Sequence, residues 1–141
     1  MNFEDKLQIQ IKVYNVGYVQ VGDRFFDMND NGEPNFDVEH ENAGSGYDED
    51  GNPIEATATR FLDFGKCIIY PNTSARLIGL NDGQKYVYSY EVIAPLSKQK
   101  YKLLPREGDK VIITKKDGTI NKTMEVKGFT TYKKRYLKLW L

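Results

Sequence analysis

The sequence predicts a single all-β domain, a small β-barrel or sandwich of about seven antiparallel strands with a long acidic loop or hairpin. Short segments of strand character are separated by turn signals at intervals of roughly 8–12 residues. Ten Tyr and seven Phe make the chain rich in aromatic residues, which favours strands. No long stretch keeps apolar residues at the three-four spacing of a helix. The 141 residues suit one domain, 1–141, with an acidic excursion at about 27–53.

The N-terminal segment has the clearest strand pattern. In residues 7–14, "LQIQIKVY", apolar and polar residues alternate strictly, and the apolar face consists of Leu7, Ile9, Ile11 and Val13. This two-residue period predicts a half-buried strand. The chain continues in extended form to residue 26, with Gly17 and Gly22 marking bends or bulges. From 27 to 53 the periodicity disappears, and a long loop or a projecting hairpin is expected there.

Regular patterns return after residue 53. Residues 53–61, "PIEATATRF", and 66–70, "KCIIY", are strand-like, and the second is an apolar run typical of a buried strand. Residues 75–94, "ARLIGLNDGQKYVYSYEVIA", predict strand, turn and strand, and the second arm places on one face Tyr86, Tyr88, Tyr90 and Val92. Pro95 ends this arm because proline has no N–H to donate into a ladder.

The C-terminal part contains the most regular hairpin signal. In residues 109–126, "DKVIITKKDGTINKTMEV", Asp117 and Gly118 separate two strand-like segments. This pair favours a type I′ turn, whose central residues have positive φ. Residues 96–107 are expected to connect to this hairpin, and residues 134–141 predict a final strand.

The net charge of zero conceals an acidic and a basic part. Residues 23–55 carry eleven acids against one base, and residues 85–141 carry fourteen bases against five acids. One interpretation is an acidic loop that stays hydrated and a sheet with lysines on its wet face. The other is complementary surfaces on neighbouring copies. The acidic side then consists of Asp27, Asp30, Glu33, Asp37, Asp48, Glu49 and Asp50, and the basic side of Lys133, Lys134, Arg135 and Lys138.

The stretch 27–39, "DMNDNGEPNFDVE", resembles the beginning of a helix-flanked calcium loop. Counting from Asp27, the next Asn, Asn and Gly fall at the third, fifth and sixth positions of such a loop. Val38 occupies the twelfth position, which must supply a bidentate glutamate, and the flanking residues are strand-like rather than helical. The stretch therefore predicts a structural turn, with weak calcium binding at 27–32 left open.

Neither an enzyme nor a cofactor is expected. His40 and Cys67 are single residues far apart in the sequence, and two ligands do not make a zinc site. His40 is interpreted as a solvated surface residue and Cys67 as a small buried apolar residue. No glycine-rich phosphate loop is present, and no residue is assigned as catalytic or metal-binding.

A basic and aromatic segment, "TTYKKRYLKLW" at 130–140, suggests a second function class. Its bases are suited to phosphates, and Tyr132, Tyr136 and Trp140 are suited to stacking on unpaired nucleobases. The sequence pI of 6.6 is far below that of a dedicated nucleic-acid-binding domain.

The sequence shows no signal peptide and no apolar run of the roughly 20 residues that a membrane span needs. With one cysteine, a disulfide scaffold within the chain is also excluded. We therefore expect a soluble protein made in the cytoplasm.

The C-terminal run "LLPREGDKVIITKKDGTINKTMEVKGF" resembles the head-closure or head–tail connector proteins of tailed bacteriophages. The likeness covers residues 86–141 and consists of a Gly-Asp-x-Val strand, an Asp-Gly hairpin and then Val-x-Gly. It implies a small barrel with long loops, arranged as a ring in the neck between portal and tail. It further implies a non-enzymatic virion protein made in the bacterial cytoplasm, whose partners are itself and portal or tail components. DNA would pass through its channel without specific binding.

Two alternatives remain open beside this expectation. One is a small barrel that binds nucleic acid through its C-terminal strand. The other is an accessory calcium- or carbohydrate-binding β module. The sequence does not give the ring size.

Overall fold

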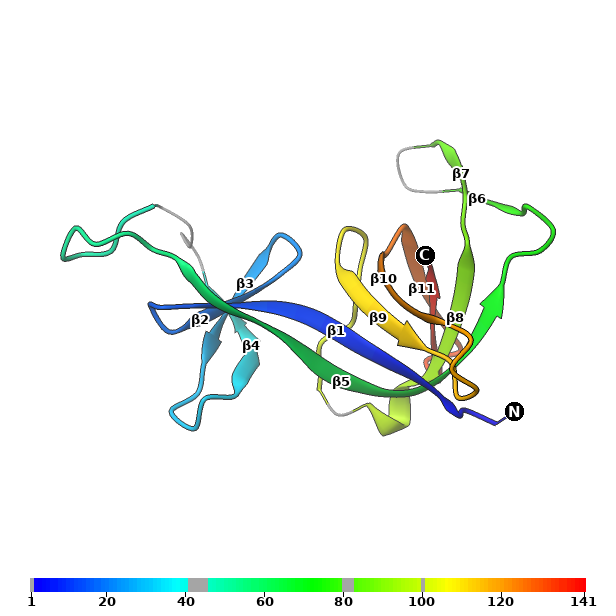
Figure 1. The fold of residues 1–141 in the computed structure, drawn as a ribbon, viewed down its shortest axis with the longest axis horizontal. Coiled ribbons are helices and arrows are strands. Elements are labelled where there is room, and N and C mark those ends of the chain that lie inside the picture. The colour runs from blue at the N-terminus through cyan, green and yellow to red at the C-terminus, as the bar shows by residue number, and fades with distance from the viewer. Residues whose placement is uncertain (1, 41–45, 80–82, 100) are drawn as a thin grey trace.

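The computed structural model describes residues 2–40, 46–79, 83–99 and 101–141, and its fold is all-β, as predicted (Figure 1). The strand number was underestimated, because the described residues form twelve strands rather than about seven. They are β1 (Asp5–Tyr14), β2 (Tyr18–Val21), β3 (Arg24–Met28), β4 (Pro34–Glu39), β5 (Ala56–Pro71), β6 (Leu77–Gly79), β7 (Lys85–Val87), β8 (Tyr90–Pro95), β9 (Lys110–Thr114), β10 (Asn121–Glu125), β11 (Gly128–Tyr132) and β12 (Tyr136–Trp140).

A long antiparallel pair, β1 and β5, is the spine of the molecule (Figure 1). The N-terminal half of β1 also pairs with β9, and its C-terminal end pairs with β2. The spine therefore joins two lobes. The barrel lobe contains β8 to β12 around one end of the spine, and the hairpin lobe contains β2, β3 and β4 at the other end.

The predicted alternation in β1 is confirmed. Leu7, Ile9 and Ile11 are at most 1% exposed, whereas the lysines on either side of this stretch are exposed. Fully burying such an aliphatic side chain contributes about 1.5–3 kcal/mol. The hydrophobic effect therefore decides which face of β1 turns inward.

A β-bulge at Gly65 explains why residues 53–71 look like two separate strands in the sequence. Leu62 and Phe64 are buried before the bulge, and Cys67 and Ile69 after it, so the buried positions change from even to odd numbers. The register of β5 against β1 shifts at this point, and Gly65 has φ of 142°. The structure contains one bent strand of 16 residues, in which the bulge keeps the apolar side chains inside after the bend.

The barrel lobe is a curled sheet whose strand order, from one edge to the other, is β11, β12, β8, β5, β1, β9 and β10. The last strand and the residue after it contribute to the core of this lobe, since Leu137, Leu139 and Leu141 have no exposed surface. The backbone of Leu141 exchanges hydrogen bonds of 2.9 and 3.2 Å with Tyr90 of β8. Leu141 is thus part of the core of this lobe.

The loop or hairpin predicted at about 27–53 is a hairpin in its first part and a turn in its last part. Residues 24–39 form the β3–β4 hairpin, and residues 46–53 form a second turn closed by a bridge between Tyr47 and Pro53. Residues 41–45 lie outside the described part of the chain. The strand, turn and strand predicted over 75–94 correspond to the antiparallel β6–β7 pair, but the second arm is divided into β7 and β8. A 3₁₀ turn at Leu96–Lys98 was not predicted.

The type I′ turn predicted at Asp117–Gly118 is wrong. Only Gly118 has a positive φ, of 79°, and a longer loop is closed by the hydrogen bond from Lys115 N to Ile120 O. The Asp117 carboxylate accepts bonds from the backbone N–H and the hydroxyl of Thr119. This local bonding stabilises a different turn from the one that the dipeptide favours.

Candidate functional site

The acidic end, defined here as the β3–β4 hairpin and the 46–53 turn, contains all seven residues of the predicted acidic side. At the hairpin tip, Asn29 N donates to Glu33 O at 2.7 Å, and the Asn31 side-chain oxygen accepts from Glu33 N at 3.1 Å. Gly32 has φ of 81°. These bonds are those of a β-turn between two strands, and no flanking helix is present among the described residues.

His40 differs from the solvated residue that the sequence suggested. Its Nδ1 lies 2.6 Å from Asp27 Oδ1, and its ring stacks on Tyr18 with the centroids 4.9 Å apart. The Asp27 carboxylate is therefore engaged with a protein partner. Within the described residues, no group of three or more His, Cys, Asp and Glu side chains is arranged to hold a metal ion.

The 46–53 turn has an internal brace. Asp48 Oδ1 accepts hydrogen bonds from Asp50 N at 3.0 Å and from Asn52 N at 2.8 Å, and Gly51 takes φ of 80°. The carboxylate of Asp48 thus holds the turn in shape, while Glu49 and Asp50 are exposed to solvent. Two negative charges are presented on a fixed backbone.

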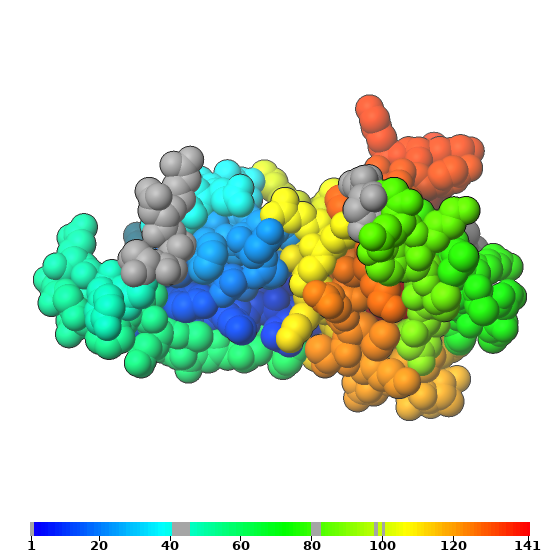
Figure 2. Space-filling model, turned by 90° about the horizontal axis from the view of Figure 1, so that it is seen from above, coloured from blue at the N-terminus to red at the C-terminus, as the bar shows by residue number. Residues whose placement is uncertain are grey.

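The basic hairpin, residues 132–136 between β11 and β12, presents three of the four predicted basic residues. Lys133 and Lys134 have φ of 51° and 55°, so the two positive-φ residues of a tight hairpin turn lie here rather than at 117–118. Arg135 N donates to Tyr132 O at 3.0 Å, which closes the turn. Lys133, Lys134 and Arg135 are all exposed. In Figure 2 this red hairpin projects beyond the surrounding surface.

Lys138 does not belong with the other three bases. It points along the sheet, 3.6 Å from Glu91 Oε1 and over the Trp140 ring. Trp140 Nε1 donates to the same carboxylate at 3.2 Å. Tyr136 is stacked on Phe3 with a centroid distance of 5.9 Å. Of the aromatic residues suggested for stacking on nucleobases, only Tyr132 is largely exposed, at 57%.

The acidic end and the basic hairpin lie in opposite halves of an elongated molecule. Both figures show the 46–53 turn at one extremity, in teal, and Figure 2 shows the basic hairpin, in orange-red, projecting from the other lobe. Among the described residues, the ion pair of the β4 acid Asp37 is with Lys102, at 3.7 Å between exposed side chains. The two charged surfaces therefore do not neutralise each other within one chain.

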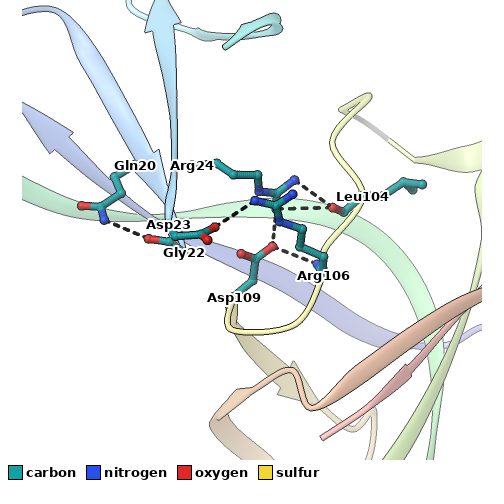
Figure 3. A network of polar contacts seen from close by, with 7 residues as sticks. All are labelled: Gln20, Gly22, Asp23, Arg24, Leu104, Arg106 and Asp109. Atoms are coloured by element: carbon teal, nitrogen blue, oxygen red, sulfur yellow. Dashed lines mark hydrogen bonds and ion pairs between the residues drawn. The ribbon is translucent and has the colours of Figure 1, made fainter. Parts of the chain in front are cut away.

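A buried polar network joins the two lobes, and sequence reasoning missed it (Figure 3). The Arg24 guanidinium in β3 pairs with Asp109, whose side chain has no exposed surface, and also reaches Leu104 O at 3.5 Å. Arg106 N donates to Asp109 Oδ2 at 3.0 Å, and Arg106 Nη2 donates to Asp23 Oδ1 at 2.9 Å. The partners are about 80 residues apart in sequence, so no local pattern reveals them.

Gly22 is required by the close approach of this network. A Cβ at Gly22 would lie 2.2 Å from Asp109 Oδ1, and the residue has φ of 59°. Asp109 Oδ1 and Arg24 Nε are buried and have no hydrogen-bond partner among the described residues. Burial raises the pKa of Asp109, against the opposing effects of the Arg106 N–H and the Arg24 charge, and burial lowers the pKa of Arg24. The Arg24–Asp109 pair is thus a strongly desolvated structural joint, whereas the Arg106–Asp23 pair beside it is exposed to solvent.

A shallow apolar hollow lies at the base of the basic hairpin. It encloses about 510 Å³ and is lined by Phe3, Pro95, Leu96, Ser97, Lys134, Arg135 and Tyr136. Its apolar walls are bordered by two cationic side chains. The sequence contains no signal for it, because its walls come from three separate segments of the chain.

No family model, curated protein or solved structure matches the chain. Within the described residues, no helix combines the length and the apolar character that crossing a membrane requires.

Proposed function

We propose that the chain is a non-enzymatic structural protein of a tailed-phage virion, a head-closure, head–tail connector or neck component that assembles with itself head to tail as a ring. The observation that supports the self-assembly is the placement of exposed acids and exposed bases in opposite lobes of one elongated domain. Head-to-tail contacts between such ends are heterologous, and they close into rings when the rotation between copies permits.

The charges of the two ends favour one orientation over others. Contact between two acidic ends or two basic hairpins places like charges together, which is costly. Contact between an acidic end and a basic hairpin pairs Glu49 and Asp50 with Lys134 and Arg135. Opposite charge contributes mainly to orientation and association rate, so the affinity also requires apolar contact.

The assignment to a phage neck rests on the sequence resemblance of residues 86–141, which fold as β7 to β12. In that role the partners are other copies and portal or tail components, and the acidic hairpins that face a channel repel DNA phosphates. The protein would then be synthesised in the bacterial cytoplasm and located in the virion. Nucleic-acid binding is less favoured, because Tyr136 and Trp140 are engaged inside the chain.

A charge-swap experiment tests the self-assembly. One variant carries Glu49→Lys and Asp50→Lys, and the other carries Lys134→Glu and Arg135→Glu; Asp48 is kept because it braces the turn. In each variant alone, positions 49 and 50 carry the same charge as positions 134 and 135, so the proposed contact brings like charges together and the variant should sediment as a monomer at low salt. An equimolar mixture should recover the wild-type mass, because each reversed end then meets an opposite charge.

A control variant with charges reversed elsewhere shows whether the effect is specific to the two proposed contact surfaces. Lys6→Glu with Lys66→Glu changes two exposed charges elsewhere and should leave the assembly mass unchanged. Electron microscopy of the assembled protein distinguishes closed rings from open filaments. Self-assembly through these ends is refuted if the wild type is a monomer at all salt concentrations, or if the mixture stays monomeric. Salt-sensitive binding of single-stranded DNA, lost in Lys134→Glu with Arg135→Glu, would instead support the nucleic-acid alternative.

A further inference from the structure

We propose that Tyr47 of one copy inserts into the apolar hollow beneath the basic hairpin of the next copy. This inference rests on the proposed head-to-tail assembly and identifies the apolar contact that charge alone does not supply. The hollow is the one lined by Phe3, Pro95, Leu96, Ser97, Lys134, Arg135 and Tyr136.

The side chain that enters the hollow belongs to an exposed aromatic residue. Tyr47 is 66% exposed, the largest exposed fraction among the large hydrophobic residues described. It stands at the end of the 46–53 turn, directly before Asp48, Glu49 and Asp50. Tyrosine is enriched at the centres of protein interfaces, since it buries a large area and loses little conformational entropy.

The turn that presents Tyr47 is already held by hydrogen bonds within the single chain, before a second copy binds. The bridge between Tyr47 and Pro53 and the two bonds to the Asp48 carboxylate hold its backbone. A preformed turn loses less conformational freedom on binding than a flexible loop of the same sequence.

The receiving surface has matching chemistry. Stacked Phe3 and Tyr136, together with Pro95 and Leu96, provide apolar walls for an aromatic ring. Lys134 and Arg135 lie at the border of the same hollow. An aromatic residue followed by three acids therefore fits it better than an apolar or a basic segment does.

The occupant comes from a second copy. The 46–53 turn lies at one extremity of the molecule (Figure 1), whereas the hollow belongs to the barrel lobe and is lined by residues before β1, at the end of β8 and at the start of β12. The β1–β5 spine separates the turn of one chain from its own hollow. The two surfaces meet when a second copy follows the first.

The experiment is a double-mutant cycle on assembly measured by sedimentation velocity. Tyr47→Ser removes the ring without changing charge, and Ser97→Trp fills the hollow from its exposed edge. Each is expected to weaken assembly roughly 10- to 100-fold. The double variant is expected to be no weaker than the worse single variant, because both changes remove one contact. Tyr70→Ser, another exposed tyrosine at 44%, is the matched control and should leave assembly unchanged.

The results separate this inference from the proposed function. If Tyr47→Ser and Ser97→Trp leave assembly unchanged while the charge-swap mixture still recovers it, the head-to-tail assembly stands and the Tyr47 contact is overturned. If the two effects multiply fully in the double variant, the residues act at separate places and the contact is again overturned. Failure of the charge-swap mixture to assemble overturns both. Thermal unfolding of each variant checks that it is folded.

Discussion

The barrel lobe and the hairpin lobe are stabilised by different interactions. The barrel lobe depends on apolar burial, and β12 alone contributes Leu137 and Leu139 with no exposed surface. In the hairpin lobe β2 and β3 bury four apolar residues, but the last half of β4 is exposed. Its β3 strand is fixed to the barrel lobe by the buried Arg24–Asp109 pair. The position of the hairpin lobe relative to the barrel lobe therefore depends in part on one buried polar contact.

The largest effect is expected from breaking that joint on one side. Arg24→Met leaves the Asp109 carboxylate buried without its cation, and removing one partner of a buried pair costs about 3–5 kcal/mol. Urea unfolding at neutral pH measures the loss. The double variant Arg24→Met with Asp109→Leu should be clearly more stable than Arg24→Met alone, because no buried charge then remains. Equal stability of the two variants would contradict a joint that depends on charge.

The pH dependence of Arg24→Met provides a second test of the same joint. A carboxyl whose pKa is raised in the folded state binds its proton more readily there than in the unfolded chain. Its contribution to stability is present below the unfolded pKa and is lost as pH rises through the folded pKa. Arg24 opposes this rise in the wild type, so the pKa of Asp109 is higher still in Arg24→Met, and the deficit of the variant should shrink as the pH falls from neutrality toward the ordinary carboxyl pKa of about 4. A deficit that grows on acidification would contradict the raised pKa of Asp109.

Next in size is a change in the barrel core. Leu137→Ala removes a fully buried side chain and should destabilise the protein by about 2–5 kcal/mol. Leu77→Ala is the control in the separate β6–β7 pair, where the side chain is 55% exposed, and should change stability by at most about 0.5 kcal/mol. Both are measured by urea unfolding, and similar losses for the two would be inconsistent with the burial described.

A smaller loss of stability is expected from alanine at two glycines, and comparing the two separates the cost of positive φ from the cost of a steric clash. Gly17 and Gly22 have φ of 84° and 59°, so alanine is strained at both. A Cβ at Gly17 meets nothing within 4 Å, whereas at Gly22 it meets the Asp109 carboxylate. Gly17→Ala should cost about 1 kcal/mol and Gly22→Ala about 1–3 kcal/mol more. Equal costs would show that the network moves aside.

The smallest perturbation is a chemical probe that leaves the sequence intact. Burial raises the pKa of Cys67 to about 12, and its side chain is fully buried. At about pH 8 the thiolate population is negligible, so a thiol reagent should not modify the native protein and should modify it fully after denaturation. Rapid labelling of native protein would mean that the β1–β5 spine opens near this residue.

The sequence by itself determined the features that depend on neighbours along the chain. The alternation of Leu7, Ile9 and Ile11 defines the buried face of β1, because successive strand residues point to opposite sides. The fold class and the concentration of acids in 23–55 and of bases in 85–141 were likewise readable. The Asn and Gly residues of the "DMNDNG" stretch indicated a turn, and they form the tip of the β3–β4 hairpin.

Only the tertiary structure decided the rest. Nothing in the sequence around Arg24 indicates a partner 85 positions away, since a buried ion pair depends on how strands are brought together in space. The continuity of β5 depends on a bulge at Gly65 that β1 imposes through pairing. Lys138 does not belong to the basic surface, because it forms an ion pair with Glu91 on the neighbouring strand β8. The distance between the acidic end and the basic hairpin follows from the length of the β1–β5 spine, a property of strand pairing that residue order alone does not encode.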